Sequence, residues 1–197
     1  MTDLVIIHGL VWGLLLTPSR LGLRNRAIVF ASITLGFYLP VIPDGYGTHC
    51  LAFYTAGWFG DFSLLLIWWS FTKTWVQESP PSGFWLVIAL IGSGLYFLVI
   101  AGVGPDAYAW GFQTAGFWVV GMILSVIAWY LRDQWLLMAL ALISLAWYFQ
   151  LLESRNIWDY LVDPIFVAIA ITQSVIMGIR QIKRQSTSVD SPSKVGE

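Results

Sequence analysis

The chain carries little charge. Of its 197 residues, 11% are Asp, Glu, Lys or Arg, 58% are hydrophobic, and the mean hydropathy is +0.74. An ordinary soluble domain has about 25% charged and about 45–50% apolar residues. Composition therefore places the chain among membrane proteins. The net charge of -1 provides no basic field for nucleic acid, so we expect no nucleic-acid partner.

Cysteine and histidine are also scarce. The single cysteine, Cys50, excludes a disulfide within the chain and a cysteine-rich metal site. The two histidines, His8 and His49, are fewer than a zinc hydrolase of the ceramidase type needs. We therefore predict no metal ion and no cofactor.

Long apolar runs are what the sequence has in abundance, and short connections separate them. A helix needs about 20 apolar residues to cross a hydrocarbon core of about 30 Å. The first run is shorter, and it is either a short first helix ending at Pro18 or an interfacial segment. The seven runs are Leu4–Thr17, Ala27–Pro43, Leu51–Phe71, Phe84–Val103, Gly111–Leu131, Gln134–Leu152 and Val162–Ile179.

These runs predict an all-α bundle of about seven transmembrane helices. Residues 1–180 would form this single domain, and the polar residues 181–197 would be a disordered cytoplasmic tail. Such a chain is an integral multi-pass protein of the plasma membrane or the bacterial inner membrane. Its first partner is the lipid bilayer itself.

Lysine and arginine predict the orientation of the bundle. If every run spans, all of these residues except Arg155 fall on one side, which the positive-inside rule makes cytoplasmic. The N-terminus would then lie outside and the C-terminus inside. The residues on the cytoplasmic side are Arg20, Arg24, Arg26, Lys73, Arg132, Arg180, Lys183, Arg184 and Lys194.

Asp61 stands inside the third apolar run. In one continuous helix from Leu51 it lies roughly 15 Å along the axis, near the middle of the bilayer. An ionisable group at that depth is costly and marks a functional site by default. If the helix begins at Trp58 instead, Asp61 lies in its first turn and complements the helix dipole. At depth, desolvation favours the neutral acid, which is able to donate a proton.

Other polar candidates lie on the predicted outer side. Pro164 makes Asp163 a natural N-cap of the last helix. Asp159 and Asp163, four residues apart, could join Glu153 in an oxygen cage for a divalent cation, although no spacing specifies one. Asp106 precedes the fifth apolar run, where it would cap a helix or act as a second acid. His8 is either a hydrogen-bonded residue of the bundle or a third catalytic group.

Two aromatic motifs resemble those of a known family. Residues 58–61 read Trp-Phe-x-Asp, and residues 104–111 read Gly-Pro-x-Ala-Tyr-x-Trp-Gly with a glutamine two positions later. In this order the motifs look like those of the transmembrane terpene cyclases, which are small seven-helix proteins. The chain departs from that family in the second helix, where residues 36–40 read Gly-Phe-Tyr-Leu-Pro instead of carrying a Trp-Glu pair. The resemblance suggests five cavity residues: Trp58, Phe59, Tyr108, Trp110 and Gln113.

Three functional hypotheses follow. The first is an enzyme that acts on a lipidic or isoprenoid molecule by carboxyl-based acid catalysis, with Asp61, Asp106 and His8 as catalytic groups. The second is a non-catalytic accessory or assembly subunit that binds partner membrane proteins. The third is a small transporter, ranked last because the sequence gives no sign of a discontinuous helix. An enzyme predicts a cavity on which Asp61 and another polar side chain converge, whereas a subunit predicts that a neighbouring group plugs Asp61.

Overall fold

The computed structural model describes residues 2–44, 47–78, 80–103, 108–112, 114–152 and 154–189. Within them the chain is all-helical apart from one short hairpin, as the apolar runs predict. The helices are α1 (Thr2–Leu16), α2 (Leu23–Tyr38), α3 (Leu51–Phe59), α4 (Leu64–Phe71), α5 (Ser82–Ala101), α6 (Thr114–Tyr130), α7 (Gln134–Tyr148), α8 (Ile157–Leu161) and α9 (Pro164–Val189). The shorter elements are a π-helix η1 (Thr72–Val76), a 3-10 helix η2 (Ala109–Phe112), and strands β1 (Pro40–Asp44) and β2 (Gly47–Cys50).

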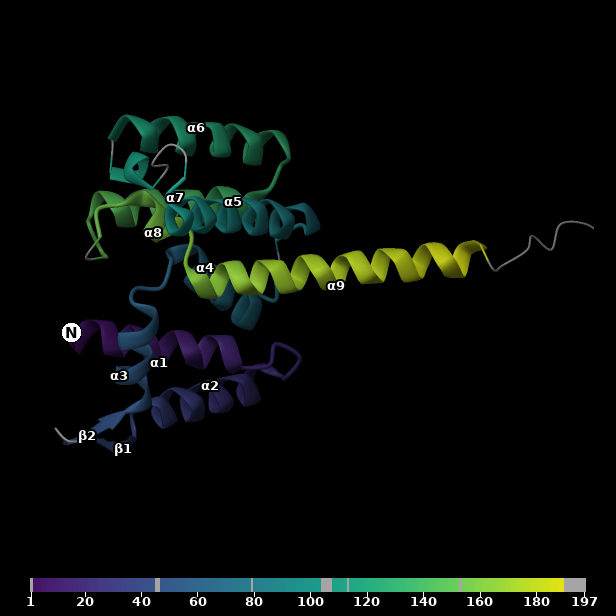
Figure 1. The fold of residues 1–197 in the computed structure, drawn as a ribbon. Helices are drawn as coiled ribbons and strands as arrows, with labels where there is room; N and C mark the ends of the chain where they lie inside the picture. Colours follow the sequence, from purple (N-terminus) through teal and green to yellow (C-terminus); the bar gives the residue numbers. More distant parts are fainter. Residues whose placement is uncertain are drawn as a thin grey trace, which may run out of the picture.

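The long helices lie side by side along one common direction (Figure 1). In this view α6 forms one edge of the bundle and α2 the opposite edge, and α4, α5, α7 and α9 lie between them. The most extensive helix contacts join α5 to α9, α1 to α2, and α6 to α7. The last part of α9 projects beyond the other helices (Figure 1).

An aromatic cluster forms the core between α4, α5, α7 and α9. The ring centroids of Trp69 and Trp85 lie 5.2 Å apart in an edge-to-face arrangement, as do those of Phe84 and Trp135. Phe166 at the start of α9 is fully buried against this cluster. Edge-to-face pairs at such separations are favourable beyond the area they bury. The cluster therefore fixes how α4 and α9 sit against α5.

The third apolar run is not one helix. It breaks at Gly60, whose backbone (φ 65°, ψ −147°) is a conformation that essentially only glycine adopts. The chain becomes helical again at Leu64. Ser63 caps this new helix, because its hydroxyl oxygen accepts the backbone N–H of Leu66 at 3.2 Å. Asp61 consequently lies in the break between α3 and α4. The prediction of a continuous helix over residues 51–71, and the placement of Asp61 within it or in its first turn, are therefore wrong.

The second and last apolar runs also differ from the prediction. Helix α2 ends at Tyr38 because Pro40 cannot continue a helix and restricts the residue before it. Strands β1 (Pro40–Asp44) and β2 (Gly47–Cys50) then pair antiparallel. At the other end of the chain, α9 remains helical as far as Val189, nine residues into the predicted disordered tail. Residues 190–197 lie outside the described residues.

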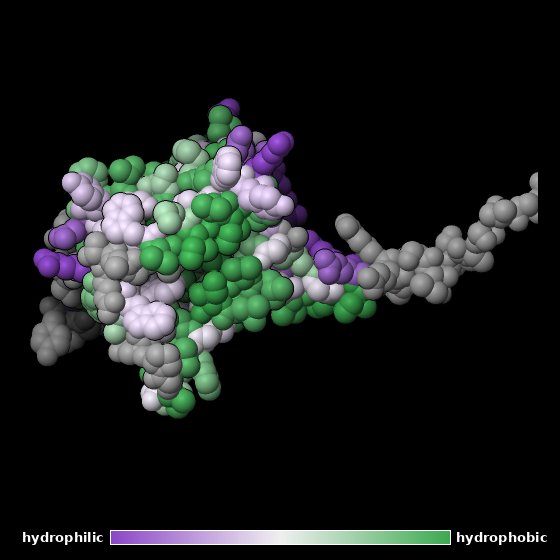
Figure 2. All heavy atoms as spheres, turned by 90° about the horizontal axis from the view of Figure 1, so that it is seen from above, coloured by the Kyte–Doolittle hydropathy of each residue, from purple (hydrophilic) through white to green (hydrophobic). Residues whose placement is uncertain are grey.

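Among the described residues, two helical stretches are long and apolar enough to cross a membrane: Gly83–Ala101 in α5 and Pro164–Lys183 in α9. Only 28% of the apolar window in α5 and 17% of that in α9 is buried, whereas the core helix of a soluble protein is mostly buried. Other apolar helices, such as α7, are shorter. On the face shown in Figure 2, hydrophobic side chains form a central band, and the hydrophilic ones gather towards the two ends.

Candidate functional site

Three aspartates from separate segments line one pocket of about 220 Å³. Asp61 comes from the break between α3 and α4, Asp159 from α8, and Asp163 from the start of α9. Tyr96 of α5 and Ser154 add two hydroxyl groups. The remaining lining residues are Phe59, Val162 and Pro164.

The site lies level with the middle of α5. Gly92, in the middle of α5, faces Val162 and Val167, so closely that a Cβ atom at this position would lie 2.3 Å from a Val167 methyl group. These two valines flank Asp163 and the start of α9. A glycine at this position thus lets α5 and α9 approach each other next to Asp163, and Tyr96, one turn further along α5, lines the pocket.

Asp163 connects the N-terminal ends of two helices. Its Oδ2 accepts the Ser63 backbone N–H at 2.9 Å and the Ser63 hydroxyl at 2.5 Å. Its Oδ1 accepts the Phe166 backbone N–H at 2.8 Å, which confirms the predicted capping of α9. The side chain is only 4% exposed. Because helix N-termini favour negative charge, two macrodipoles stabilise this one buried carboxylate.

Asp159 is held by a tyrosine and, indirectly, by an asparagine. The Tyr108 hydroxyl donates to both carboxylate oxygens of Asp159 at 2.9 Å. Asn156 is fully buried, and its side-chain amide donates to the Tyr108 carbonyl at 2.9 Å. Its Oδ1 accepts the Trp158 N–H at 3.0 Å and so caps α8. Asn156 therefore positions both partners of the Tyr108–Asp159 pair.

Burial raises the pKa of Tyr108 to about 12, and the hydrogen bond to Asp159 and its negative charge add to this shift. Burial also raises the pKa of Tyr160, and the charges of Asp61 and Asp159 contribute. These hydroxyls therefore remain protonated donors at neutral pH. The site thus combines carboxylates with neutral phenol donors.

We expect the Tyr108–Asp159 pair to affect how the thermal stability of the protein depends on pH in alkaline solution. The folded pKa of Tyr108 exceeds its unfolded value of 10.0, so its contribution to stability is complete below pH 10 and is lost as the pH rises through about 12. The wild type should therefore lose thermal stability between these pH values more steeply than Tyr108→Phe. Thermal unfolding measured at a series of alkaline pH values tests this. Parallel curves for the two proteins would contradict it.

His8 holds the break that carries Asp61. Its ring is fully buried and stacks on Phe62 with centroids 4.1 Å apart. Nε2 lies 2.7 Å from the Gly60 carbonyl oxygen, which only accepts, so Nε2 carries a proton. Nδ1 lies 3.2 Å from the Thr55 hydroxyl oxygen. His8 is not among the lining residues of the pocket, but it holds the carbonyl group of Gly60 next to Asp61, so His8 is a positioning residue for Asp61.

The other predicted site residues have separate locations. Phe59 lines the pocket and Tyr108 bonds to Asp159, whereas Trp58 and Trp110 are 77% and 57% exposed and do not line it. Within the described part of the chain, no three His, Cys, Asp or Glu side chains lie close enough together to hold a metal ion. The predicted oxygen cage includes Glu153, which lies outside the described residues. Three candidates lie outside the described residues: Asp106, Gln113 and Glu153.

The sequence analysis missed four residues of the site. Ser63 and Asn156 each precede a helix, and a search for N-cap residues finds both. No sequence signal singles out Tyr96 or Ser154, because their contribution arises only from the packing of α5 against α8 and α9.

No protein-family model, curated protein or solved structure matches the chain.

Proposed function

We propose that the chain is a multi-pass membrane protein that crosses the bilayer seven times. The crossing segments would be α1, α2, α3 with α4, α5, α6, α7 and α9. The exposed apolar side chains of α5 and α6 support this, because a soluble monomer rarely exposes such continuous apolar surface. Non-helical backbone within a membrane is tolerated only where protein covers it or where it lines a cavity. The break around Asp61 meets that condition, since the break adjoins the pocket and Ser63 is fully buried.

Within this arrangement the chain functions as an enzyme on a lipidic or isoprenoid molecule. The observation that carries this proposal is the convergence of Asp61, Asp159 and Asp163 on one pocket between helices. The enzyme hypothesis predicts a cavity on which several polar side chains converge. The hypothesis of an accessory subunit, in which a neighbouring group plugs Asp61, predicts no such cavity. Ionisable side chains inside the membrane are rare and mark functional sites.

The three aspartates are suited to different tasks. All described hydrogen bonds of Asp163 go to helix ends, so its role is structural. Asp159 is paired with Tyr108. Asp61, in the break, is the group best placed to give a proton to a molecule in the pocket. The rings of Phe59 and Tyr96 then stabilise the positive charge that protonation creates.

The size of the pocket limits what it accepts. Its volume of about 220 Å³ is below the roughly 300–1,000 Å³ of sites that enclose a whole drug-sized ligand. The pocket therefore receives the reacting end of a larger molecule. In a protein that spans the bilayer, the rest of that molecule remains in contact with lipid or with apolar side chains. A lipidic substrate meets both conditions.

A second candidate, a proton-coupled transporter, gains support from the broken helices. Small transporters commonly place their binding sites where discontinuous helices meet at the middle of the bilayer. The α3–α4 break and the start of α9 meet in this way through the bond between Ser63 and Asp163. No discontinuous helix is evident from the sequence, and for that reason the transporter was ranked last. The break between α3 and α4 removes this reason.

Asp61→Asn is the decisive test of the enzyme. Membranes containing the wild type, Asp61→Asn or Glu78→Gln are incubated with a total lipid extract, and the products are identified by mass spectrometry. Glu78 is exposed and distant from the site, so Glu78→Gln controls for the loss of a carboxylate. We expect a product that the wild type and Glu78→Gln form and that Asp61→Asn does not, because an amide cannot donate the proton.

Two outcomes count against the enzyme. Equal conversion by Asp61→Asn at equal expression excludes Asp61 as the acid. A proton flux into sealed vesicles that requires Asp61, without lipid conversion, favours the transporter instead.

A further inference from the structure

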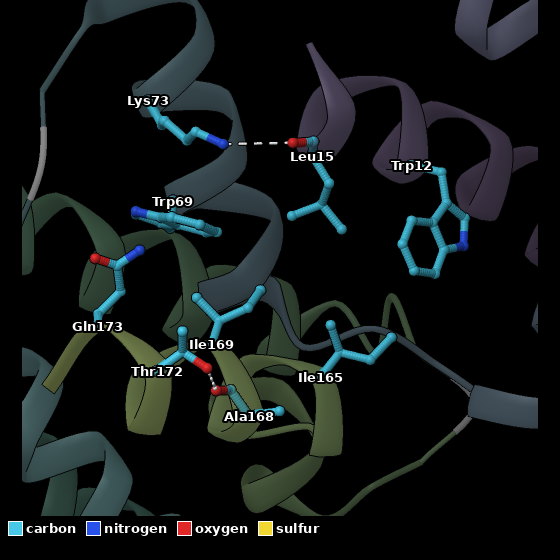
Figure 3. Close-up of a pocket in the computed structure, with 9 residues that line it drawn as sticks. All are labelled: Trp12, Leu15, Trp69, Lys73, Ile165, Ala168, Ile169, Thr172 and Gln173. Carbon is cyan, nitrogen blue, oxygen red and sulfur yellow. Dashed lines mark hydrogen bonds between the residues drawn. The ribbon is translucent and has the colours of Figure 1, made fainter. Parts of the chain in front are cut away.

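A second cavity, which shares no lining residue with the aspartate pocket, is a mainly apolar groove. It has a volume of about 440 Å³ and lies between α1, α4 with η1, and α9 (Figure 3). Trp12 and Trp69 stand on opposite sides of it, and Ile165 and Ile169 of α9 lie along its length (Figure 3). The other lining residues are Leu15, Lys73, Ala168, Thr172 and Gln173.

Lys73 supplies the positive charge at one end of the groove. Its Nζ donates to the Leu15 carbonyl oxygen at 3.3 Å and lies 5.2 Å from the centroid of the Trp69 ring. An ammonium has three N–H donors, so this one long bond leaves two for another acceptor. None of the described residues that line the groove is acidic. The groove therefore offers a cation without its own counter-charge.

The polarity of the groove changes along its length. Lys73 and Gln173 lie towards one side of the groove and Ile165 lies towards the other (Figure 3). Lys73 belongs to η1, in the basic connection before α5, and Ile165 follows Asp163 by two residues. Thr172 donates its hydroxyl proton to the Ala168 carbonyl of its own helix, so its side chain adds little polarity. A ligand that fits this gradient has a negative group at one end and a hydrocarbon chain behind it.

The volume matches a single hydrocarbon chain. A methylene group is similar in size to a water molecule, whose share of liquid volume is about 30 Å³, so the groove has room for roughly 15 methylene groups. A whole partner helix, about 10–12 Å in diameter with its side chains, occupies far more volume than one hydrocarbon chain. The volume of the groove therefore favours a lipid chain as the occupant.

We propose that this groove binds one acyl chain of an anionic phospholipid, whose phosphate contacts the Lys73 ammonium. Long basic side chains near helix ends direct their charge towards the membrane interface in this way. The lipid comes from the leaflet on the side of the basic connections. Because the groove shares no lining residue with the aspartate pocket, this inference does not depend on the proposed enzyme.

Purified full-length protein, exchanged into dioleoyl-phosphatidylglycerol or dioleoyl-phosphatidylcholine, provides the test. Native mass spectrometry counts the bound lipids, and competition between the two lipids gives the preference. Lys73→Met removes the charge and keeps the length of the side chain. Lys183→Met removes a charge of the same type from the exposed end of α9, outside the groove. Ala168→Trp fills the groove from an exposed position of α9 and leaves Lys73 intact.

We expect the wild type and Lys183→Met to retain phosphatidylglycerol over phosphatidylcholine. In Lys73→Met that preference should fall about tenfold, the effect of losing one charge-assisted hydrogen bond. Ala168→Trp should lose the retained lipid altogether, and this variant keeps the test valid if Lys73→Met does not fold. An unchanged preference in Lys73→Met, equal binding of the two lipids by the wild type, or full lipid retention by Ala168→Trp would each refute the proposal.

Discussion

Replacing Asp163 with alanine is expected to lower the thermal midpoint by on the order of 10 °C, from the usual relation between midpoint and unfolding free energy. The carboxylate accepts two donors of Ser63 and the N–H of Phe166. Without it these buried donors have no acceptor, and each such loss costs about 1–3 kcal/mol. Three such losses total about 3–9 kcal/mol, which is a large part of the roughly 5–15 kcal/mol that stabilises a typical domain.

Two weaker variants distinguish this role from a general effect of mutation. Asp163→Asn keeps one acceptor oxygen but turns an NH₂ group towards either Ser63 or Phe166, so we expect an intermediate loss. Ser63→Ala removes only the hydroxyl, which donates to Asp163 and caps α4. The expected order of midpoints is wild type, Ser63→Ala, Asp163→Asn, Asp163→Ala, measured by thermal unfolding in one detergent. If Asp163→Ala unfolds at the same temperature as the wild type, α4 and α9 are held together by packing alone.

The apolar runs predicted the helices because length and hydrophobicity are local properties. Each of the seven runs contains at least one helix, and α5 and α7 begin within two residues of the prediction. Two exceptions have local causes. Pro40 ends α2 before the run ends, and the polar residues after Ile179 are compatible with a helix that continues to Val189.

The break at Gly60 was not predictable from hydrophobicity, since the run from Leu51 to Phe71 is apolar on both sides of it. Glycine is tolerated inside helices, and so its presence alone does not indicate a break. The added signal is Ser63, a favoured N-cap residue placed just before a new apolar run. Gly92 followed by Ser93 nevertheless lies inside the unbroken helix α5, so glycine followed by an N-cap residue does not by itself predict a break.

The sequence identified the three aspartates of the pocket but not their grouping. Asp61 was assigned to one candidate set, with Asp106 and His8, and Asp159 and Asp163 to another, with Glu153. The structure brings members of both sets to one pocket, through contacts such as that between Ser63 and Asp163, which lie 100 residues apart. Contacts over such separations depend on how helices pack, which the periodicity of a single run does not encode.

Gly111→Ala is expected to damage the site as much as the loss of Asp163. A Cβ atom at Gly111 would lie 1.6 Å from Oδ1 of Asn156 and 2.6 Å from Cδ1 of Trp158. Asn156 is fully buried, so its side chain has no free space into which it can turn. Its displacement breaks the bonds to Tyr108 and Trp158. Overpacking and two broken buried hydrogen bonds together cost on the order of 3–5 kcal/mol.

Gly121→Ala is the matched control, because it adds the same methyl group to the same region. Gly121 lies inside α6, and a Cβ atom there meets nothing within 4 Å. Alanine is the better helix former by about 0.5–1 kcal/mol, so this variant should unfold at or above the wild-type temperature. The two variants thus differ in the sign of their effect. If Gly111→Ala unfolds at the same temperature as Gly121→Ala, Asn156 does not fix the backbone of Tyr108. The Tyr108–Asp159 pair must then be held by other contacts.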